Sequence, residues 1–254
     1  MLVPVEKILE DSELKRISLV LCYPRPTDTE VSSRIKELRS LGVEALLFRG
    51  RTEISGAPVL GKGHVGVVVA ALRGGRKLAL KIRRVDADRE TMHREAEMLR
   101  KANSVSVGPK LLDCTDNFLL MELVEGKNLR QWLGDETDAE QVRRVLRELL
   151  EQCRRLDEGG IDHGELSRAY RHVVVTPSGQ TRIIDFETAS TLRRTSNVTS
   201  IGHYLFFGKE NSEAVQRVLG EIDLKELQSR LRSYKEEPTE RSFREILRYA
   251  RLET

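Results

Sequence analysis

The stretch APVLGKGHVGVVVAALRGGRKLALKIRRV, residues 57–85, carries the strongest signal for the fold of this chain. Apolar runs alternate in it with glycine-rich breaks: a strand, a glycine turn, a second strand, the Gly74-Gly75 turn and a third strand. Apolar runs joined by a two-residue glycine turn indicate a β-hairpin. The stretch therefore predicts an antiparallel meander, and it argues against a dinucleotide-binding unit, in which a glycine motif leads from a strand into a helix.

The residues before this meander form a pattern of their own. Residues 16–24 are mostly apolar, and Pro24 and Pro26 stop the run, which predicts a strand. Residues 27–42 carry apolar side chains at helical spacing and predict a helix. Residues 43–50 predict a second strand. We therefore expect a β-α-β extension over residues 1–53, without a catalytic motif.

After the meander, the sequence predicts both strands and helices, and helices predominate toward its end. A helix is predicted within residues 86–103, a buried strand at 117–126 and an amphipathic helix within 137–160. Residues 172–187 read as a hairpin around a Pro-Ser-Gly turn. The chain from about residue 212 is predicted to be largely helical.

This order predicts an α+β fold of two lobes with a cleft between them. The first lobe is expected at residues 54–126, as an antiparallel sheet with one helix. The second, mainly helical lobe is expected at residues 127–254.

Composition limits the classes of function. Of 254 residues, 33% are charged, but the net charge is only +3, so the chain lacks the concentrated basic surface of a dedicated nucleic-acid binder. Three widely spaced cysteines argue against a disulfide framework or a zinc site and predict reduced thiols. The first residues do not resemble a signal peptide, and the apolar runs are too short to cross a membrane. We expect a cytoplasmic protein without a membrane partner.

The glycines of the first turn are candidates for phosphate binding. Gly61, Gly63 and Gly66 follow the pattern G-x-G-x-x-G-x-V. Without Cβ atoms, their backbone N–H groups can approach phosphate oxygens closely. The pattern alone is weak, because many glycine-rich hairpins have no ligand.

Three charged residues lie where charge is costly unless it is compensated. Lys81 lies in an apolar strand and needs an anionic partner. Glu95 shares the apolar face of the following helix and is the candidate partner. Asp185 ends the apolar strand of the hairpin at 172–187, which is costly unless it binds a cation, and Mg²⁺ bound to nucleotide phosphates would supply one.

Together these motifs resemble the protein-kinase-like superfamily in order and spacing, over about residues 55–210. The likeness is to compact, atypical archaeal Ser/Thr kinases, including RIO-type and tRNA-modification-complex kinases. It implies that ATP and Mg²⁺ are bound, with Asp185 and His172 at the metal. The residues expected to contact ATP are Leu60, Gly61, Lys62, Gly63, Gly66, Val68, Ala79, Lys81, Glu95, Met121, Glu122 and Val124.

The sequence HGELSRAYRHVVV, residues 163–175, departs from the catalytic loop of such kinases. Glu165 stands where they have Asp, and Tyr170 where they have Asn. His172, not Tyr170, directly precedes the apolar strand, so the step from the acid is two residues longer than usual. This insertion favours a rebuilt loop in which Glu165 still reaches the acceptor hydroxyl. His172 then either contacts the metal site or makes a structural hydrogen bond.

Further departures concern regulation. Gly164 replaces the Arg that receives a phosphorylated activation loop, DFE replaces DFG at 185–187, and no A-P-E follows. These changes argue against activation by loop phosphorylation.

The sequence therefore predicts an ATP-dependent Ser/Thr protein kinase that acts on a protein or on itself, with Lys81, Glu165 and Asp185 as catalytic residues. Two other interpretations stay open: a catalytically impaired nucleotide-binding regulator, and a small-molecule kinase. The last helix carries four arginines at helical spacing, for which a solvated face is the default and an RNA or ribonucleoprotein contact the alternative.

Overall fold

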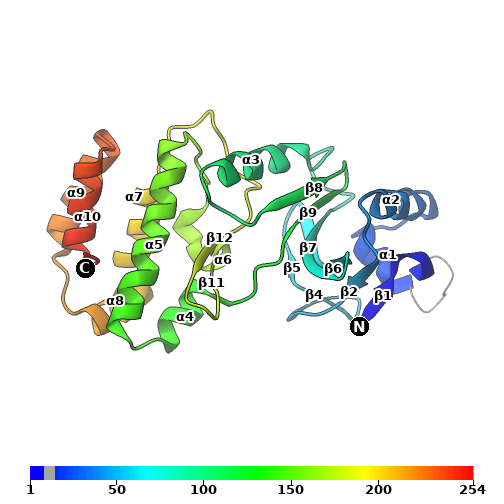
Figure 1. Cartoon of the computed structure of the whole chain (residues 1–254), viewed down its shortest axis with the longest axis horizontal. Helices are drawn as coiled ribbons and strands as arrows, with labels where there is room; N and C mark the ends of the chain where they lie inside the picture. Colours follow the sequence, from blue (N-terminus) through cyan, green and yellow to red (C-terminus); the bar gives the residue numbers. More distant parts are fainter. Residues whose placement is uncertain (9–14, 254) are drawn as a thin grey trace. The chain divides into compact units, whose positions relative to one another are not determined.

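The computed structural model describes residues 1–8 and 15–253. The chain divides into two compact units (Figure 1). The first comprises Met1–Arg100 and Pro109–Leu123, and the second comprises Lys101–Gly108 and Val124–Thr254. The expected extension, residues 1–53, therefore lies in the same unit as most of the expected first lobe.

An antiparallel sheet of seven strands forms the centre of the first unit, in the order β1-β2-β6-β7-β9-β8 with β5 paired to β6. The strands are β1 (Leu2–Pro4), β2 (Ala45–Leu47), β5 (Gly61–Lys62), β6 (Gly66–Arg73), β7 (Arg76–Arg83), β8 (Leu111–Cys114) and β9 (Phe118–Glu122). A separate hairpin joins β3 (Thr52–Ile54) to β4 (Ala57–Val59). Because β2 pairs with β6, residues of the extension complete the sheet.

The predicted meander is confirmed. β6 and β7 pair over their whole length, from Gly66 opposite Arg83 to Arg73 opposite Arg76. Gly74 and Gly75 at the turn have φ angles of 56° and 71°. Two consecutive residues with positive φ give the hairpin turn that matches the twist of the strands, and glycine adopts it without steric cost.

The helices of the first unit differ from the prediction in two places. The described helices are η1 (Val5–Ile8), α1 (Lys15–Leu21), α2 (Asp28–Ser40) and α3 (His93–Ser104), the last of which continues into the second unit. The strand expected at 16–24 is wrong, because this segment is mostly α1. Ile17, Val20 and Leu21 are fully buried at the spacing of one helix face. The extension is therefore β-α-α-β, with β1 as a strand that was not predicted.

The second difference is the start of α3, which begins at His93 rather than near residue 86. The backbone N–H of Met92 donates to the carbonyl of Asp116, which fixes the start of the helix from another part of the chain. β8 was also not predicted.

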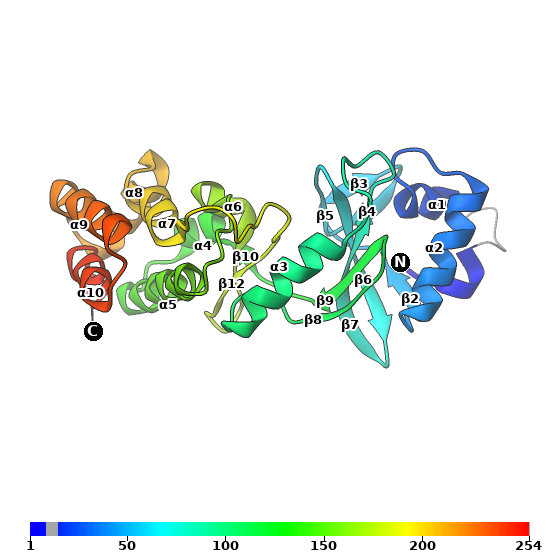
Figure 2. The same cartoon turned by 90° about the horizontal axis from the view of Figure 1, so that it is seen from above.

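The extension covers one face of the sheet. Alternate residues of β6, β7 and β9, including Val67, Leu80 and Leu120, belong to one core cluster with the buried residues of β1, α1 and α2. Figure 2 shows α1 and α2 on this side of the sheet and α3 on the other. The intervening residues of the same strands face α3.

A buried arginine ties the extension to the sheet. Arg34 of α2 is fully buried, and its guanidinium donates to the carbonyls of Leu21 and Arg83 and to Oδ1 of Asn117. Glu37, one turn further along α2, accepts hydrogen bonds from the backbone and side chain of Asn117. A buried charge with this set of acceptors is satisfied, so it fixes the position of α2.

The second unit is mainly helical, with one small antiparallel sheet. Its helices are α4 (Leu129–Asp135), α5 (Ala139–Glu158), η3 (Leu166–Arg168), α6 (Ala169–His172), α7 (Asn197–Phe206), α8 (Lys209–Leu219), α9 (Leu224–Glu236) and α10 (Glu240–Tyr249). The strands β10 (Lys127–Asn128), β11 (Val173–Val175) and β12 (Thr181–Ile183) pair in that order. The hairpin predicted at 172–187 is therefore confirmed.

The helix predicted within 137–160 is α5, which begins after the N-cap Asp138 and ends at Gly159. Its apolar residues, from Val142 to Leu156, are fully buried. An antiparallel sheet unit with one following helix and a mainly helical unit together confirm the predicted α+β, kinase-like fold class. Among the described residues, no helix is long and apolar enough to cross a membrane.

Candidate functional site

Lys81 and Glu95 form a buried ion pair in the first unit. Lys81 Nζ donates to Glu95 Oε1 at 2.8 Å, and the two side chains are 5% and 3% exposed. β7 places the lysine and the first turn of α3 places the glutamate. The partner predicted for Lys81 is therefore the one that it has. The pair fixes an ammonium group on the α3 side of the sheet.

Several residues predicted to contact ATP share this side of the sheet. Val68 lies directly opposite Lys81 in the β6–β7 ladder, and Gly61 lies opposite Val68. Ala79, two residues before Lys81, lies opposite Met121 of β9. Directly paired residues point to the same face of a sheet, as do residues two apart in a strand. The register thus gathers these five residues on one face.

Gly66 lies closely against the Lys81 side chain. A Cβ atom at Gly66 would lie 3.0 Å from the Cε and Cγ atoms of Lys81 and from the carbonyl oxygen of Ile82. The loop itself is closed by the N–H of Gly63, which donates to the carbonyl of Gly66 at 2.8 Å. The absence of a side chain at Gly66 therefore leaves space for the Lys81 side chain, a role that the sequence pattern did not reveal.

The other residues predicted to contact ATP lie at the edges of this face. Leu60 donates its N–H to the carbonyl of Val68, and Lys62 is exposed. The Glu122 carboxylate accepts a hydrogen bond from the N–H of Lys110. Val124 belongs to the second unit.

Backbone pairing in the second unit holds the start of the altered loop, residues 163–172. Asp162 and Ser190 exchange two backbone hydrogen bonds of 2.9 Å. Between them Gly164 has a φ of +87°, and a Cβ there would lie 2.5 Å from Nη2 of Arg193 and 3.0 Å from Oγ1 of Thr188. Both the conformation and the space require glycine, which explains why this loop cannot carry the usual arginine at 164.

The acid of this loop lies beside the metal-site candidates. His172, which is 6% exposed, has Nε2 3.6 Å from Oε2 of Glu165 and Nδ1 3.9 Å from Oδ2 of Asp185. The side chains of Glu165 and Asp185 are 25% and 36% exposed. The three residues that the sequence placed at the catalytic acid and the metal therefore meet at one point. Two carboxylates flanking an imidazole give a locally negative site that favours a cation.

Asp185 has a backbone conformation that few residues other than glycine adopt, with φ at +68°. The preceding residue, Ile184, donates its N–H to the carbonyl of His172, which joins the end of the hairpin to the loop. Asp tolerates the left-handed region better than most residues, and such conformations cluster at functional sites. The turn directs the Asp185 carboxylate toward His172.

His163 packs against the residues of this site. It is fully buried, its ring packs edge-on against those of His172 and Phe186, and Nε2 lies 3.1 Å from the carbonyl oxygen of Ile184. Burial, and then the nearby His172, lower the pKa of His163 to about 4. At neutral pH His163 is therefore uncharged, and Nε2 carries the proton that it donates to the carbonyl.

Tyr170 is not part of this cluster. Its ring lies under the guanidinium groups of Arg130 and Arg171, at 4.7 Å and 5.3 Å, and its hydroxyl accepts a hydrogen bond from Arg171. Arg168 is exposed at the end of η3. His172, at the end of α6 directly before β11, occupies the position next to Asp185 instead.

A polar network that was not predicted joins the loop to α5 and α7. The buried Asn197 accepts the N–H of His163 and donates to Asp157 and to the carbonyl of Ile161. Burial raises the pKa of Asp157, although it accepts further hydrogen bonds from Val198. These are single polar residues far apart in sequence, so only the fold reveals that they meet.

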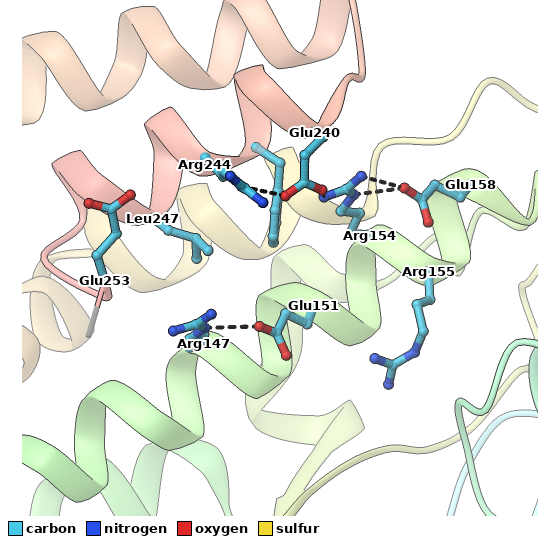
Figure 3. A pocket seen from close by; sticks show the side chains of 10 residues that line it. Arg147, Glu151, Arg154, Arg155, Glu158, Glu240, Arg244, Leu247 and Glu253 are labelled. Atoms are coloured by element: carbon cyan, nitrogen blue, oxygen red, sulfur yellow. Dashed lines mark hydrogen bonds and ion pairs between the residues drawn. The ribbon is translucent and has the colours of Figure 1, made fainter.

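Of the four arginines considered for RNA contact (Arg241, Arg244, Arg248 and Arg251), Arg244 lines a hollow of 710 Å³ between α5 and α10, together with Arg147, Arg154 and Arg155 (Figure 3). Its four arginines are matched by four glutamates. Arg154 pairs with both Glu158 and Glu240, and Arg244 also pairs with Glu240 (Figure 3). Arg241 and Arg248 likewise lie among glutamates, namely Glu240, Glu245 and Glu253. This mixed surface is not the concentrated basic surface that RNA binding needs, and it favours the solvated-face interpretation.

Comparison with known proteins agrees with the geometry. The family model of the RIO domain matches residues 71–198. A Bacillus subtilis protein named "Putative serine/threonine-protein kinase YrzF" is 28% identical over 153 residues, which are 58% of this chain and 68% of that protein. An uncharacterized protein of Methanocaldococcus jannaschii is 33% identical over 86 residues, 34% of this chain and 72% of that protein. The chain therefore belongs to the RIO-domain family, an atypical branch of the protein-kinase-like proteins.

Proposed function

We propose that this chain is an ATP-dependent protein kinase that transfers a phosphoryl group to a Ser or Thr hydroxyl, on another protein or on itself. The observation that carries the proposal is the meeting of Glu165, His172 and Asp185 within one unit. In spite of the altered loop, a carboxylate lies beside the candidate metal residues. RIO-domain membership and the printed name of the Bacillus subtilis relative support the same class of reaction.

The residues fit the phosphates of ATP. Gly66 is packed so closely that a side chain would fill the space beside Lys81, and Glu95 holds the ammonium of Lys81. We assign the phosphates to the backbone of Gly61, Gly63 and Gly66 and to Lys81. We assign the remaining contacts, adenine included, to Leu60, Lys62, Val68, Ala79, Met121, Glu122 and Val124.

The donor set also fits a divalent cation. Asp185 offers carboxylate oxygens, which Mg²⁺ prefers, and His172 offers a nitrogen close to them. When bound, Mg²⁺ neutralises charge on the phosphates. Asp185 would hold it, with His172 at its side.

Glu165 then acts on the acceptor. Its carboxylate orients the hydroxyl and accepts its proton, while the new O–P bond forms and the bond between the γ-phosphorus and the ADP oxygen breaks. Kinases depend mainly on positioning and on neutralising charge, so a carboxylate one methylene longer than usual can serve if the loop places it correctly. The two added residues before His172 supply that adjustment.

A second candidate function is a regulator that binds ATP without transferring phosphate. The regulator is favoured by the position of His172, because its Nε2 already lies 3.6 Å from Oε2 of Glu165. Gly164, which removes the arginine for a phosphorylated activation loop, would suit either this role or a small-molecule kinase.

Transfer of label from γ-labelled ATP decides between these functions. Wild type would be incubated with Mg²⁺ and a protein acceptor, beside Asp185→Asn and the matched control Glu213→Gln on an exposed position of α8. Label in wild type and in the control, with none in Asp185→Asn, supports the kinase. ATP-induced thermal stabilisation without any transfer supports the regulator, and label in metabolites rather than protein supports the small-molecule kinase.

A further inference from the structure

Tyr23 of the extension lies against the glycine-rich loop. It belongs to the segment between α1 and α2, and its half-buried side chain packs on the core of the first unit. Its carbonyl accepts the N–H of Val85, just after β7, at 2.9 Å. The ring is therefore fixed at its base by the fold of the extension.

Lys62 of the loop is held by this ring. Its Nζ donates to the Tyr23 hydroxyl at 2.7 Å and lies 4.5 Å from the ring centroid. The two contacts join the same ammonium to the hydroxyl and to the ring of Tyr23. Lys62 lies in β5, opposite Val67 of β6, so the contact is made by the loop itself.

Arg84 makes a second connection to the same loop. Its guanidinium lies 5.0 Å from the centroid of the Tyr23 ring and donates to the carbonyl of Gly63 at 3.0 Å. Its backbone N–H donates to the carbonyl of Val65. Asp86 holds the guanidinium in place by an ion pair of 2.7 Å. The ring of Tyr23 thus contacts two cations, each of which touches the glycine-rich loop.

We propose that Tyr23 is a positioning residue that anchors the glycine-rich loop, residues 61–66, to the N-terminal extension and so sets the affinity for the phosphates of ATP. The consequence for ATP rests on the proposed function. The anchoring itself rests only on contacts within the first unit. It gives residues 1–53 a role at the nucleotide site beyond covering the back of the sheet.

The physical effect is preorganisation. Glycine-rich turns have many conformations, and a ligand that selects one of them loses affinity to the cost of ordering the loop. An anchored loop has been ordered before the ligand arrives. The proposed function assigns the phosphates of ATP to the glycine-rich loop. Loss of the anchor should therefore weaken ATP and ADP binding and leave adenosine binding unchanged.

The test compares Tyr23→Phe and Tyr23→Leu with wild type. Phenylalanine keeps the ring and removes the hydroxyl, whereas leucine removes both. Tyr249→Leu is the matched control, since Tyr249 of α10 also contacts two guanidinium groups, those of Arg230 and Arg248, but lies in the second unit. Amide hydrogen exchange at Gly63 is measured without nucleotide, and dissociation constants are measured for ATP, ADP and adenosine.

We expect exchange at Gly63 to be about tenfold faster in Tyr23→Leu and less affected in Tyr23→Phe. We expect the ATP dissociation constant to rise about fivefold in Tyr23→Leu, with adenosine unchanged. Unchanged exchange in both Tyr23 variants overturns the anchor, and so does an equal loss of adenosine and ATP binding. If wild type binds no ATP, the proposed function fails, while the exchange rates still decide whether Tyr23 anchors the loop.

Discussion

Lys81 Nζ and Glu95 Oε1 lie 2.8 Å apart, and both side chains are almost completely buried. A buried pair stabilises a protein little compared with apolar residues of the same size, but loss of one partner leaves the other charge uncompensated. Its retention in the first unit therefore points to use of the ammonium group rather than to stability.

This pair gives a prediction for stability. Glu95→Gln or Lys81→Met alone should lower the free energy of unfolding by about 3–5 kcal/mol, and the double variant should lose less than the sum. Urea denaturation of all four proteins measures the coupling. Arg73→Met is the control, because the Arg73–Asp113 pair is about two-fifths exposed, and its loss should cost less than about 1 kcal/mol. Additive losses at Lys81 and Glu95 would contradict the role of the pair.

Gly66→Ala should displace the Lys81 side chain. The new Cβ would be 3.0 Å from two carbons of that side chain, so either they or the strand must move. We expect a loss of about 1–3 kcal/mol in the free energy of unfolding, together with weaker ATP binding by calorimetry. Gly134→Ala in α4 is the control, since nothing lies within 4 Å of its Cβ. A Gly66→Ala protein as stable as this control would refute the crowding at Gly66.

The stability of the protein should fall in mild acid because of His163. Its pKa is lowered from 6.5 to about 4 in the folded protein, so between these values the unfolded chain binds more protons. Protonation of His163 does not affect the free energy of unfolding above about pH 6.5. As the pH falls from there toward 4, the free energy of unfolding decreases by up to about 3 kcal/mol. Denaturation at several pH values measures this slope.

His163→Gln is the matched variant for this measurement, because its amide can still donate to the carbonyl of Ile184 but does not titrate. We expect its stability to depend less on pH between 4 and 6.5. An unchanged slope would assign the acid sensitivity to other groups.

His172→Asn should change the preference for the metal ion. Family resemblance places an Asn at the metal. Both Mg²⁺ and Mn²⁺ prefer oxygen ligands, but Mn²⁺, a transition-metal ion, accepts an imidazole nitrogen more readily than Mg²⁺ does, so the change to an amide oxygen should favour Mg²⁺. We expect the ratio of Mg²⁺- to Mn²⁺-supported transfer to rise about tenfold in this variant. Initial rates with each ion measure it. Equal effects with both ions would indicate that His172 only supports the loop.

Much of the first unit could be predicted from its sequence, because its signals are local. The Gly74-Gly75 turn specifies the hairpin, and Lys81 in an apolar strand requires a partner that only Glu95 offers on an apolar helix face. The strand prediction at residues 16–24 was wrong because a short apolar run is equally compatible with a strand and with a buried helix. The spacing of Ile17, Val20 and Leu21 was the available signal for a helix.

Other features depend on contacts that sequence spacing does not encode. Gly164 is fixed by Arg193 and Thr188, and the start of α3 by Asp116. From the sequence alone, the buried Arg34 cannot be distinguished from the other charged residues of its helix. Each is decided by a neighbour far along the chain, so only the fold reveals it.

The proposed function depends on Glu165 as a working catalytic carboxylate in an altered loop. The most direct measurement is the single-turnover rate of transfer from γ-labelled ATP for wild type, Glu165→Gln and Glu165→Asp, with thermal shift to confirm folding and ATP binding. We predict transfer by wild type, a loss of at least about 100-fold in Glu165→Gln, and a smaller loss in Glu165→Asp, whose shorter side chain withdraws the carboxylate. Equal rates for wild type and Glu165→Gln, or no transfer by wild type that binds ATP, would contradict the claim.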